Sequence, residues 1–181
     1  PMIQAIRSGS SDDPASRARG IYDWVVANID YRKDGSGWGN GDTLWACSER
    51  YGNCTDFHSL ILSLARYEAI PARFEMGFPV PQGQDEGAIG GYHCWASLFV
   101  EGQGWLPMDA SEARKNPEKQ EMFYGTLPMD RVRFTVGRDL RLGDAHLGAP
   151  LNYFIHPYAE MNGVDATSRV ESNYRFWSVS G

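Results

Sequence analysis

The stretch Tyr51-Gly52-Asn53-Cys54-Thr55-Asp56-Phe57-His58 joins a glycine-containing loop to a helix with a clear apolar stripe. Asn53 is a good helix N-cap, and Asp56, three residues later, can complete a capping box, so Cys54 is predicted at the first helical position. The free N–H groups and positive dipole end of a helix N-terminus favour a thiolate and can hold an oxyanion. Cys54 is therefore a candidate nucleophile.

The helix that begins at Cys54 is predicted to run to about Glu68, before Pro71, and to form the centre of the core. Its apolar stripe consists of Phe57, Leu60, Ile61, Leu64 and Ala65. Another helix is predicted from Pro14 onward, because proline suits a first helical turn and an apolar face follows it. That face consists of Ala18, Ile21, Tyr22, Val25 and Ile29.

After Pro71 the sequence changes to short runs that resemble strands. They cover residues 72–78, 92–100, 105–108, 131–136, 151–155 and 170–179. Helices followed by strands predict an α+β fold. Residues 79–91, rich in Gly and Pro, predict a mobile loop beside the site, and the polar residues 115–129 predict a surface crossing.

The composition bounds the class of protein. With 181 residues, the chain fits one catalytic domain over residues 1–181. A net charge of -6, with no Lys- or Arg-rich run among aromatics, argues against a nucleic-acid partner.

No apolar run reaches the roughly 18 residues needed to span a bilayer, and no signal-peptide pattern opens the chain. Since Pro1 stands in place of an initiator Met, we expect that a preceding segment was cropped. A cytoplasmic and an exported location both stay open, and we expect a monomer.

Three cysteines are too few for a disulfide scaffold. A bridge between Cys47 and Cys94 stays open, although Cys47 is more simply a small apolar filler. A structural zinc module is disfavoured, because the chain has no Cys-x-x-Cys or His-Glu-x-x-His spacing. We expect neither a metal nor a cofactor.

His93 and Asp109 follow Cys54 in the chain order of nucleophile, base and orienting acid. Along residues 92–100 the alternation of a strand puts Cys94 on the face opposite His93. A three-residue hairpin loop, residues 101–103, would set Val100 against Gly104 and leave Asp109 diagonal to His93. A two- or four-residue turn would face Asp109 the wrong way, so the triad predicts an odd-membered or bulged hairpin.

These three residues predict thiol acyl transfer. Cys54 attacks a peptide or amide carbonyl, His93 receives the thiol proton and later protonates the leaving amine, and Asp109 orients the imidazole. The backbone N–H of Cys54 is one oxyanion donor.

Further residues are expected around the triad. Trp38 and Trp45, beside a Gly- and Ser-rich loop, and the N-cap Asn53 are candidates for the second oxyanion donor or for the walls of the cleft. His58 lies one turn after Cys54 on the same helix face and is an alternative base, although a supporting or surface role fits it better. Tyr92 and Trp95 are expected beside His93, where Trp95 would pack.

The residues from about Pro14 to Glu112 resemble the transglutaminase-like superfamily. Gly52-Asn53-Cys54 looks like its nucleophile segment, His93-Cys94-Trp95 like its His-x-Trp strand, and Gly104-Trp105-Leu106-Pro107-Met108-Asp109 like its Gly-Trp-x-x-x-Asp strand. The resemblance implies a papain-like core in which the nucleophile's helix packs on an antiparallel sheet, with Cys54, His93 and Asp109 as the triad. It is closest to bacterial members, many of which are thought to be cysteine peptidases or amidases. It does not imply calcium activation.

Several functions stay open on this basis. Hydrolysis of a peptide or amide is the first hypothesis, and amine-dependent cross-linking of glutamine side chains is the second, since both use one acyl-enzyme. Peptidoglycan peptides or other bacterial acyl amides would fit such a hydrolase by analogy. Arylamine acetyl transfer shares the residue order, but nothing marks a coenzyme A site. A binding module that keeps the fold without turnover is a further alternative.

Overall fold

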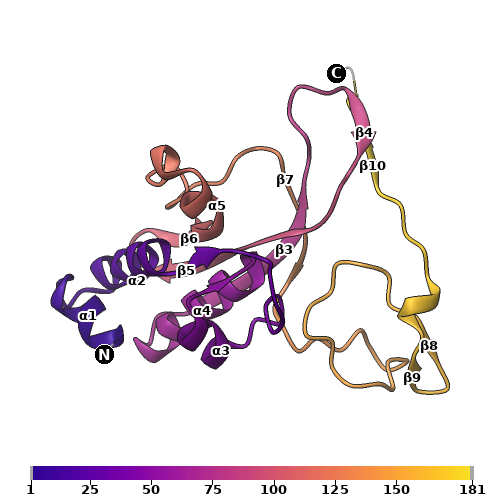
Figure 1. Ribbon diagram of the computed structural model, residues 1–181, viewed down its shortest axis with the longest axis horizontal. Helices are drawn as coiled ribbons and strands as arrows, with labels where there is room; N and C mark the ends of the chain where they lie inside the picture. Colours follow the sequence, from indigo (N-terminus) through magenta and orange to yellow (C-terminus); the bar gives the residue numbers. More distant parts are fainter. Residues whose placement is uncertain (1, 180–181) are drawn as a thin grey trace. The chain divides into compact units, whose positions relative to one another are not determined.

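The computed structural model describes residues 2–179, which divide into two compact units. The first unit contains residues 2–74 and 94–128, and the second contains residues 75–93 and 129–179. Figure 1 shows the order of their helices and strands along the chain. That all of them form one catalytic domain stays a prediction. None of the helices among residues 2–179 has the length and apolar character of a membrane span.

The first unit holds the helices. They are α1 (Met2–Ser8), α2 (Pro14–Asn28), α3 (Thr43–Glu49), α4 (Cys54–Tyr67), α5 (Ala110–Lys115) and the 3-10 turn η1 (Pro117–Lys119). Asp13 caps α2 by accepting a hydrogen bond from the Ser16 backbone N–H at 2.9 Å. The apolar face predicted for this helix is confirmed, because its five residues are fully buried.

Helix α4 confirms the prediction made at the Cys54 stretch. Asn53 caps it, the capping box with Asp56 is present, and Cys54 is the first helical residue. The stripe predicted from Phe57 to Ala65 is buried. Burial of such a stripe is what holds a helix of this length in place, since a 14-residue helix is marginal alone.

Two short strands precede α4 in the first unit. β1 (Asp30–Tyr31) and β2 (Tyr51–Gly52) pair in parallel, with Tyr31 opposite Gly52. The backbone N–H of Asp30 donates to Arg50 O at 2.8 Å, and that of Arg32 donates to Gly52 O at 3.0 Å. This ladder brings Tyr31 beside the start of α4, and neither strand was predicted.

The hairpin of β5 (His93–Val100) and β6 (Gly104–Met108) has the predicted register. Val100 pairs with Gly104 and Ala96 with Met108, so residues 101–103 form the three-residue loop. β3 (Ala72–Pro79) begins in the first unit, where the strand order is β6-β5-β3. The sheet is antiparallel where β5 meets β6, as the α+β prediction requires.

The loop depends on glycine at its far end. Gly104 has φ +82°, and a Cβ there would meet no atom within 4 Å, so only backbone conformation resists a side chain. We expect Gly104→Ala to lower the free energy of unfolding by about 1 kcal/mol, measured by urea denaturation. Gly91→Ala is the control, because Gly91 also faces open space but lacks a positive φ. Equal losses in the two variants would contradict this reasoning.

The second unit is made of strands and loops. Within it β3 pairs with β7 (Arg131–Val136), with a register shift between Met76 and Gly77. The shift accompanies a close approach, since a Cβ at Gly77 would lie 1.9 Å from Val132 O. β4 (Glu86–Ala88) pairs with β10 (Arg175–Trp177), and β8 (Glu160–Met161) with β9 (Val164–Asp165). The turn η2 (Thr167–Arg169) completes the unit.

Three predictions for the loops and strands were wrong in part. Residues 151–155 form no strand and contribute only an isolated bridge between Leu140 and Leu151. Of the run 170–179 only residues 175–177 are a strand, which pairs with β4 in the segment predicted as a loop. The stretch 115–129 is not wholly a surface crossing, since Phe123 is buried. Strand composition without a hydrogen-bonded partner does not make a strand.

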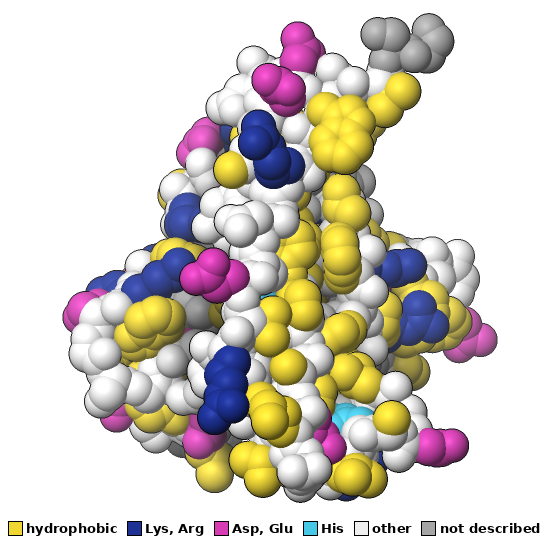
Figure 2. Space-filling view, turned by 90° about the vertical axis from the view of Figure 1, so that its right-hand side faces the viewer, with side chains coloured by type: hydrophobic (Ala, Val, Ile, Leu, Met, Phe, Trp, Pro, Cys, Tyr) yellow, Lys and Arg dark blue, Asp and Glu magenta, His cyan; other side chains and the backbone are white. Residues whose placement is uncertain are grey.

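The second unit exposes many hydrophobic side chains. They include Met129, Val132, Phe134, Val136 and Trp177. Three of them alternate along β7 and therefore share one face of that strand. Figure 2 shows how hydrophobic side chains, in yellow, spread between charged ones on the face drawn.

Candidate active site

Cys54 lies where the chain enters α4 and is only 4% exposed. Its predecessor Asn53 accepts a hydrogen bond from the Thr55 backbone N–H at 2.8 Å. The side chain of Asn53 is therefore engaged as the N-cap, a structural role beside its candidacy for the cleft. The thiol stands at the positive end of the helix dipole, which favours negative charge.

Asp56 has a larger role than the predicted cap. Its carboxylate accepts hydrogen bonds from the backbone N–H groups of Asn53 at 2.9 Å, Gly39 at 2.7 Å and Gly41 at 3.0 Å. Burial raises the pKa of Asp56, although these three donors act against the shift. A Cβ at Gly52 would lie 2.4 Å from Asp56 Oδ2, so glycine is required there by the close approach. Asp56 thus fixes the loop of residues 39–41 to the start of α4.

The two tryptophan candidates, Trp38 and Trp45, lie in different surroundings. Trp38 directly precedes Gly39, which Asp56 binds, and is half-buried. Trp45 lies on α3 and packs edge-on against Tyr51, with ring centroids 5.1 Å apart. A Cβ at Gly37 would lie 2.5 Å from Trp45 Nε1, so the Gly37 backbone covers that nitrogen. The indole nitrogen of Trp45 is therefore enclosed, which leaves Trp38 as the better candidate for a hydrogen-bond donor.

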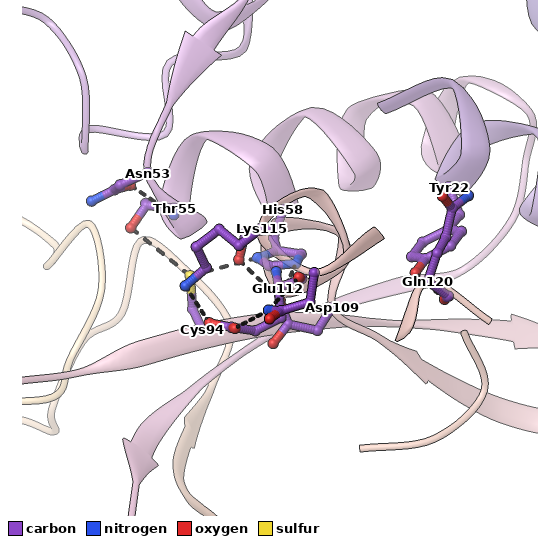
Figure 3. Close-up of polar contacts among 11 residues, drawn as sticks. Tyr22, Asn53, Thr55, His58, Cys94, Asp109, Glu112, Lys115 and Gln120 are labelled. Carbon is purple, nitrogen blue, oxygen red and sulfur yellow. Dashed lines mark hydrogen bonds and ion pairs between the residues drawn. The ribbon is translucent and has the colours of Figure 1, made fainter. Parts of the chain in front are cut away.

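Cys94 lies against the first turn of α4 (Figure 3). Its Sγ is 3.9 Å from Thr55 Oγ1 and 3.8 Å from His58 Nδ1, and its side chain is fully buried. Burial raises the pKa of Cys94 well above its usual value, and a hydrogen bond with the Cys54 thiol adds to the shift. The two thiols are therefore neighbours, a contact that sequence analysis did not anticipate.

Asp109 directly follows β6 and caps α5. The carboxylate is fully buried and accepts hydrogen bonds from the Ser111 hydroxyl at 2.9 Å and from the Glu112 backbone N–H at 3.0 Å. The same oxygen lies 3.6 Å from His58 Nε2. His58 is fully buried, so the surface role considered for it is wrong, and it bridges from Cys94 to Asp109.

His93 is the first residue of β5 and is 6% exposed. The trans peptide bond holds its Cα about 3.8 Å from that of Cys94, whose side chain touches the first turn of α4. Its neighbours differ in environment. Tyr92 packs against Tyr153 in the second unit, with ring centroids 5.7 Å apart, while Trp95 is buried as predicted.

Tyr31 is a residue of the site that the sequence did not indicate. Its ring lies 6.1 Å from that of Phe57, and Lys115 Nζ lies 4.5 Å from its centroid. Burial raises the pKa of Tyr31, and Cys54 and Glu112 add to the shift. The phenol thus lies near Cys54, and no pattern in the sequence indicated this position.

Two carboxylates of the first unit lie close enough together here to bind one metal ion. Those of Asp109 and Glu112 come within 4.8 Å of each other. Glu112 already forms an ion pair with Lys115, and Asp109 accepts the bonds at the start of α5, so both are engaged. That the protein uses no metal stays a prediction.

The family profile described as "Transglutaminase-like superfamily" matches residues 3–110. The chain belongs to this superfamily. The match spans Cys54, His93 and Asp109, and it agrees with the α4 and β5–β6 elements that carry them. A transglutaminase-like chain was the expectation from its three motifs, and this expectation is confirmed.

Comparisons with individual proteins found one curated relative and solved structures of similar fold. A curated but uncharacterized protein of Haemophilus influenzae is 28% identical over an alignment of 204 residues. The alignment covers 95% of this transglutaminase-like chain and 55% of the relative. The chain thus spans about half the length of that relative.

Two solved structures share the fold. One, from Cytophaga hutchinsonii, is named as a candidate cysteine protease, with a TM-score of 0.50, 24% identity, and coverage of 68% of this chain and 36% of its own. The other, a TGase, has a TM-score of 0.52, 11% identity, and coverage of 70% and 35%.

Proposed function

We propose that this transglutaminase-like chain is a cysteine peptidase or amidase that forms a thioester on Cys54. The observation that carries the proposal is the position of this thiol, at the first residue of a fully capped helix. A helix N-terminus stabilises the thiolate that attacks and the oxyanion that follows. The fold that this chain shares with a solved structure named as a candidate cysteine protease supports the same reaction class.

His93 and Asp109 complete the proposed triad. The Cys54 thiol gives its proton to His93, the thiolate attacks the amide carbon, and His93 returns the proton to the leaving amine. Water then attacks the thioester, with His93 as base, and releases the acid. Asp109 orients the imidazole and stabilises its charged form, a task suited to a buried carboxylate directly after β6, the strand that pairs with β5.

The oxyanion would bind at the start of α4. The backbone N–H of Cys54 is one donor, and the indole of Trp38 is the proposed second, because Asp56 ties the loop after Trp38 to this helix. Trp45 is set aside, since Gly37 covers its indole nitrogen.

Burial of the nucleophile favours water as the acyl acceptor. Cys54 is 4% exposed and lies near Tyr31, so the smallest acceptor reaches the thioester most easily. Cross-linking of glutamine side chains by an amine is the second candidate, since one solved neighbour is a TGase.

Partition of the acyl group tests the proposal. A glutamine-containing peptide and a set of peptide amides are incubated with the protein, with and without a fluorescent primary amine, and acid-quenched samples are analysed by mass spectrometry. We expect an acyl adduct on the tryptic peptide of residues 51–66, which holds Cys54, and free acid as the main product. An amine adduct as the main product would identify a cross-linking enzyme. No acyl adduct with any substrate would favour the binding module.

A further inference from the structure

The first unit holds two neighbouring thiols, and the acyl-transfer mechanism uses only one of them, that of Cys54. Cys54 and Cys94 are both reduced, and they come from elements far apart in the sequence, the start of α4 and the start of β5. Cys94 Sγ lies beside Thr55, the residue after Cys54, and beside His58, one turn further along that helix, and it forms a hydrogen bond with the Cys54 thiol. The two sulfurs therefore lie side by side in a buried space.

The two thiols differ in exposure. Cys54 keeps 4% of its surface exposed, while Cys94 has none, so a small solute meets Cys54 first. Cys94 remains a protonated thiol at neutral pH, because burial and the neighbouring Cys54 raise its pKa. An amide substrate cannot reach Cys94, so this cysteine is unsuited to be a second nucleophile for acyl transfer.

Cys94 nevertheless has a proton acceptor of its own. His58 Nδ1 lies 3.8 Å from Cys94 Sγ, and His58 Nε2 lies 3.6 Å from Asp109 Oδ1. A carboxylate on the Nε2 side favours the tautomer with its proton there, which leaves the Nδ1 lone pair toward the thiol. The first unit thus contains a buried thiol, imidazole and carboxylate in series (Figure 3).

We propose that Cys54 and Cys94 form a reversible disulfide when a peroxide oxidises the nucleophile, and that Cys94 is the resolving thiol of this modification site. The Cys54 thiolate attacks hydrogen peroxide, forming a sulfenic acid and releasing hydroxide. The sulfur of Cys94 then attacks that of Cys54, the S–OH bond breaks, and the Cys94 proton passes through His58 to the leaving hydroxyl, which departs as water. The two thiols lose two electrons and the peroxide gains them.

The disulfide would protect the enzyme as well as stop it. A sulfenic acid without a neighbouring thiol is oxidised onward to sulfinic acid, which a dithiol does not reverse. A bridge to Cys94 blocks that route and returns the thiol on reduction. The bridge requires the two sulfurs, which are already neighbours, to close to about 2.05 Å.

Tryptic mapping tests the proposal, since each cysteine lies in its own peptide: residues 34–50 hold Cys47, 51–66 hold Cys54 and 74–114 hold Cys94. The protein is treated with hydrogen peroxide, blocked with iodoacetamide and digested without reduction. We expect peptide 51–66 linked to peptide 74–114, and dithiothreitol should restore free Cys54. In Cys94→Ala we expect sulfinic acid on Cys54 and no recovery, whereas Cys47→Ala should behave as the parent.

Three results would overturn the proposal: sulfinic acid on Cys54 in the parent protein, a link to the peptide of Cys47, or no oxidation of Cys54. A separate fluorescence denaturation curve of Cys94→Ala shows whether that variant folds, and the map of the parent protein does not depend on it. The proposal rests on the reactive Cys54 of the proposed function, but the two can fail separately. A disulfide without amide turnover contradicts the hydrolase alone, and turnover without a disulfide contradicts the switch alone.

Discussion

Cys54→Ala is expected to lower kcat on any amide substrate by roughly 10⁶-fold, the size of loss seen when a triad hydrolase loses its nucleophile. The variant keeps Asn53 and Asp56, and alanine is a good helix former, so α4 should remain intact. An initial-rate assay on the substrate found in the partition experiment measures the loss. Cys47→Ala, on the neighbouring helix α3, is the matched control and should keep full activity.

Alkylation gives a readout that needs no substrate. We expect Cys54 to react with iodoacetamide well below the free thiol pKa of about 8.5, and His93→Ala to slow this reaction. Cys94 should not react in the folded protein, because it is fully buried and its pKa is raised. If Cys54 reacts no faster than Cys47 and His93→Ala changes nothing, the triad is wrong.

Asp56→Ala is expected to lower the free energy of unfolding by more than about 3 kcal/mol. The substitution removes the acceptor from three backbone N–H groups, those of Gly39, Gly41 and Asn53, and each unsatisfied donor costs about 1–3 kcal/mol. Activity should fall by more than the stability loss explains, since the loop of Trp38 is released from α4. Chemical denaturation and assays well below the unfolding midpoint separate the two effects.

Asp42→Ala is the matched control for this prediction. Asp42 also caps a helix, α3, and accepts from Leu44 N and Trp45 N, but it is exposed. Its loss should cost only about 1 kcal/mol. Equal effects of the two variants would show that Asp56 acts only as a helix cap.

The sequence predicted those parts of the site that depend on local spacing. Asn53 and Asp56 flank Cys54 within one helical turn, so the cap and the helix start follow from neighbouring residues. The register of the β5–β6 hairpin follows similarly from the length of one loop. Each of these involves residues close together in the chain, where propensity and geometry decide the outcome.

Contacts between distant residues could not be predicted in this way. Nothing near Asp56 indicates that it binds Gly39 and Gly41, and a two-residue strand gives no periodicity that would place Tyr31 at the site. Residues 151–155 show the opposite case, because their strand-like composition finds no partner strand. A backbone hydrogen bond across the chain depends on the whole fold, which a single sequence window does not contain.

The loop of residues 101–103 has a consequence for how this chain can diverge. The side chains of Glu101 and Gln103 are exposed, so these two positions would accept many substitutions, whereas Gly102 has φ +80°, which favours glycine. A change in their number is different, since one residue more or fewer would shift β6 against β5 and turn its alternate side chains to the opposite face. Asp109 follows β6 directly and would turn with it. In related chains that keep His93 and Asp109, we therefore expect the residues at positions 101 and 103 to vary freely, glycine to stay at position 102, and insertions and deletions in the loop to be selected against.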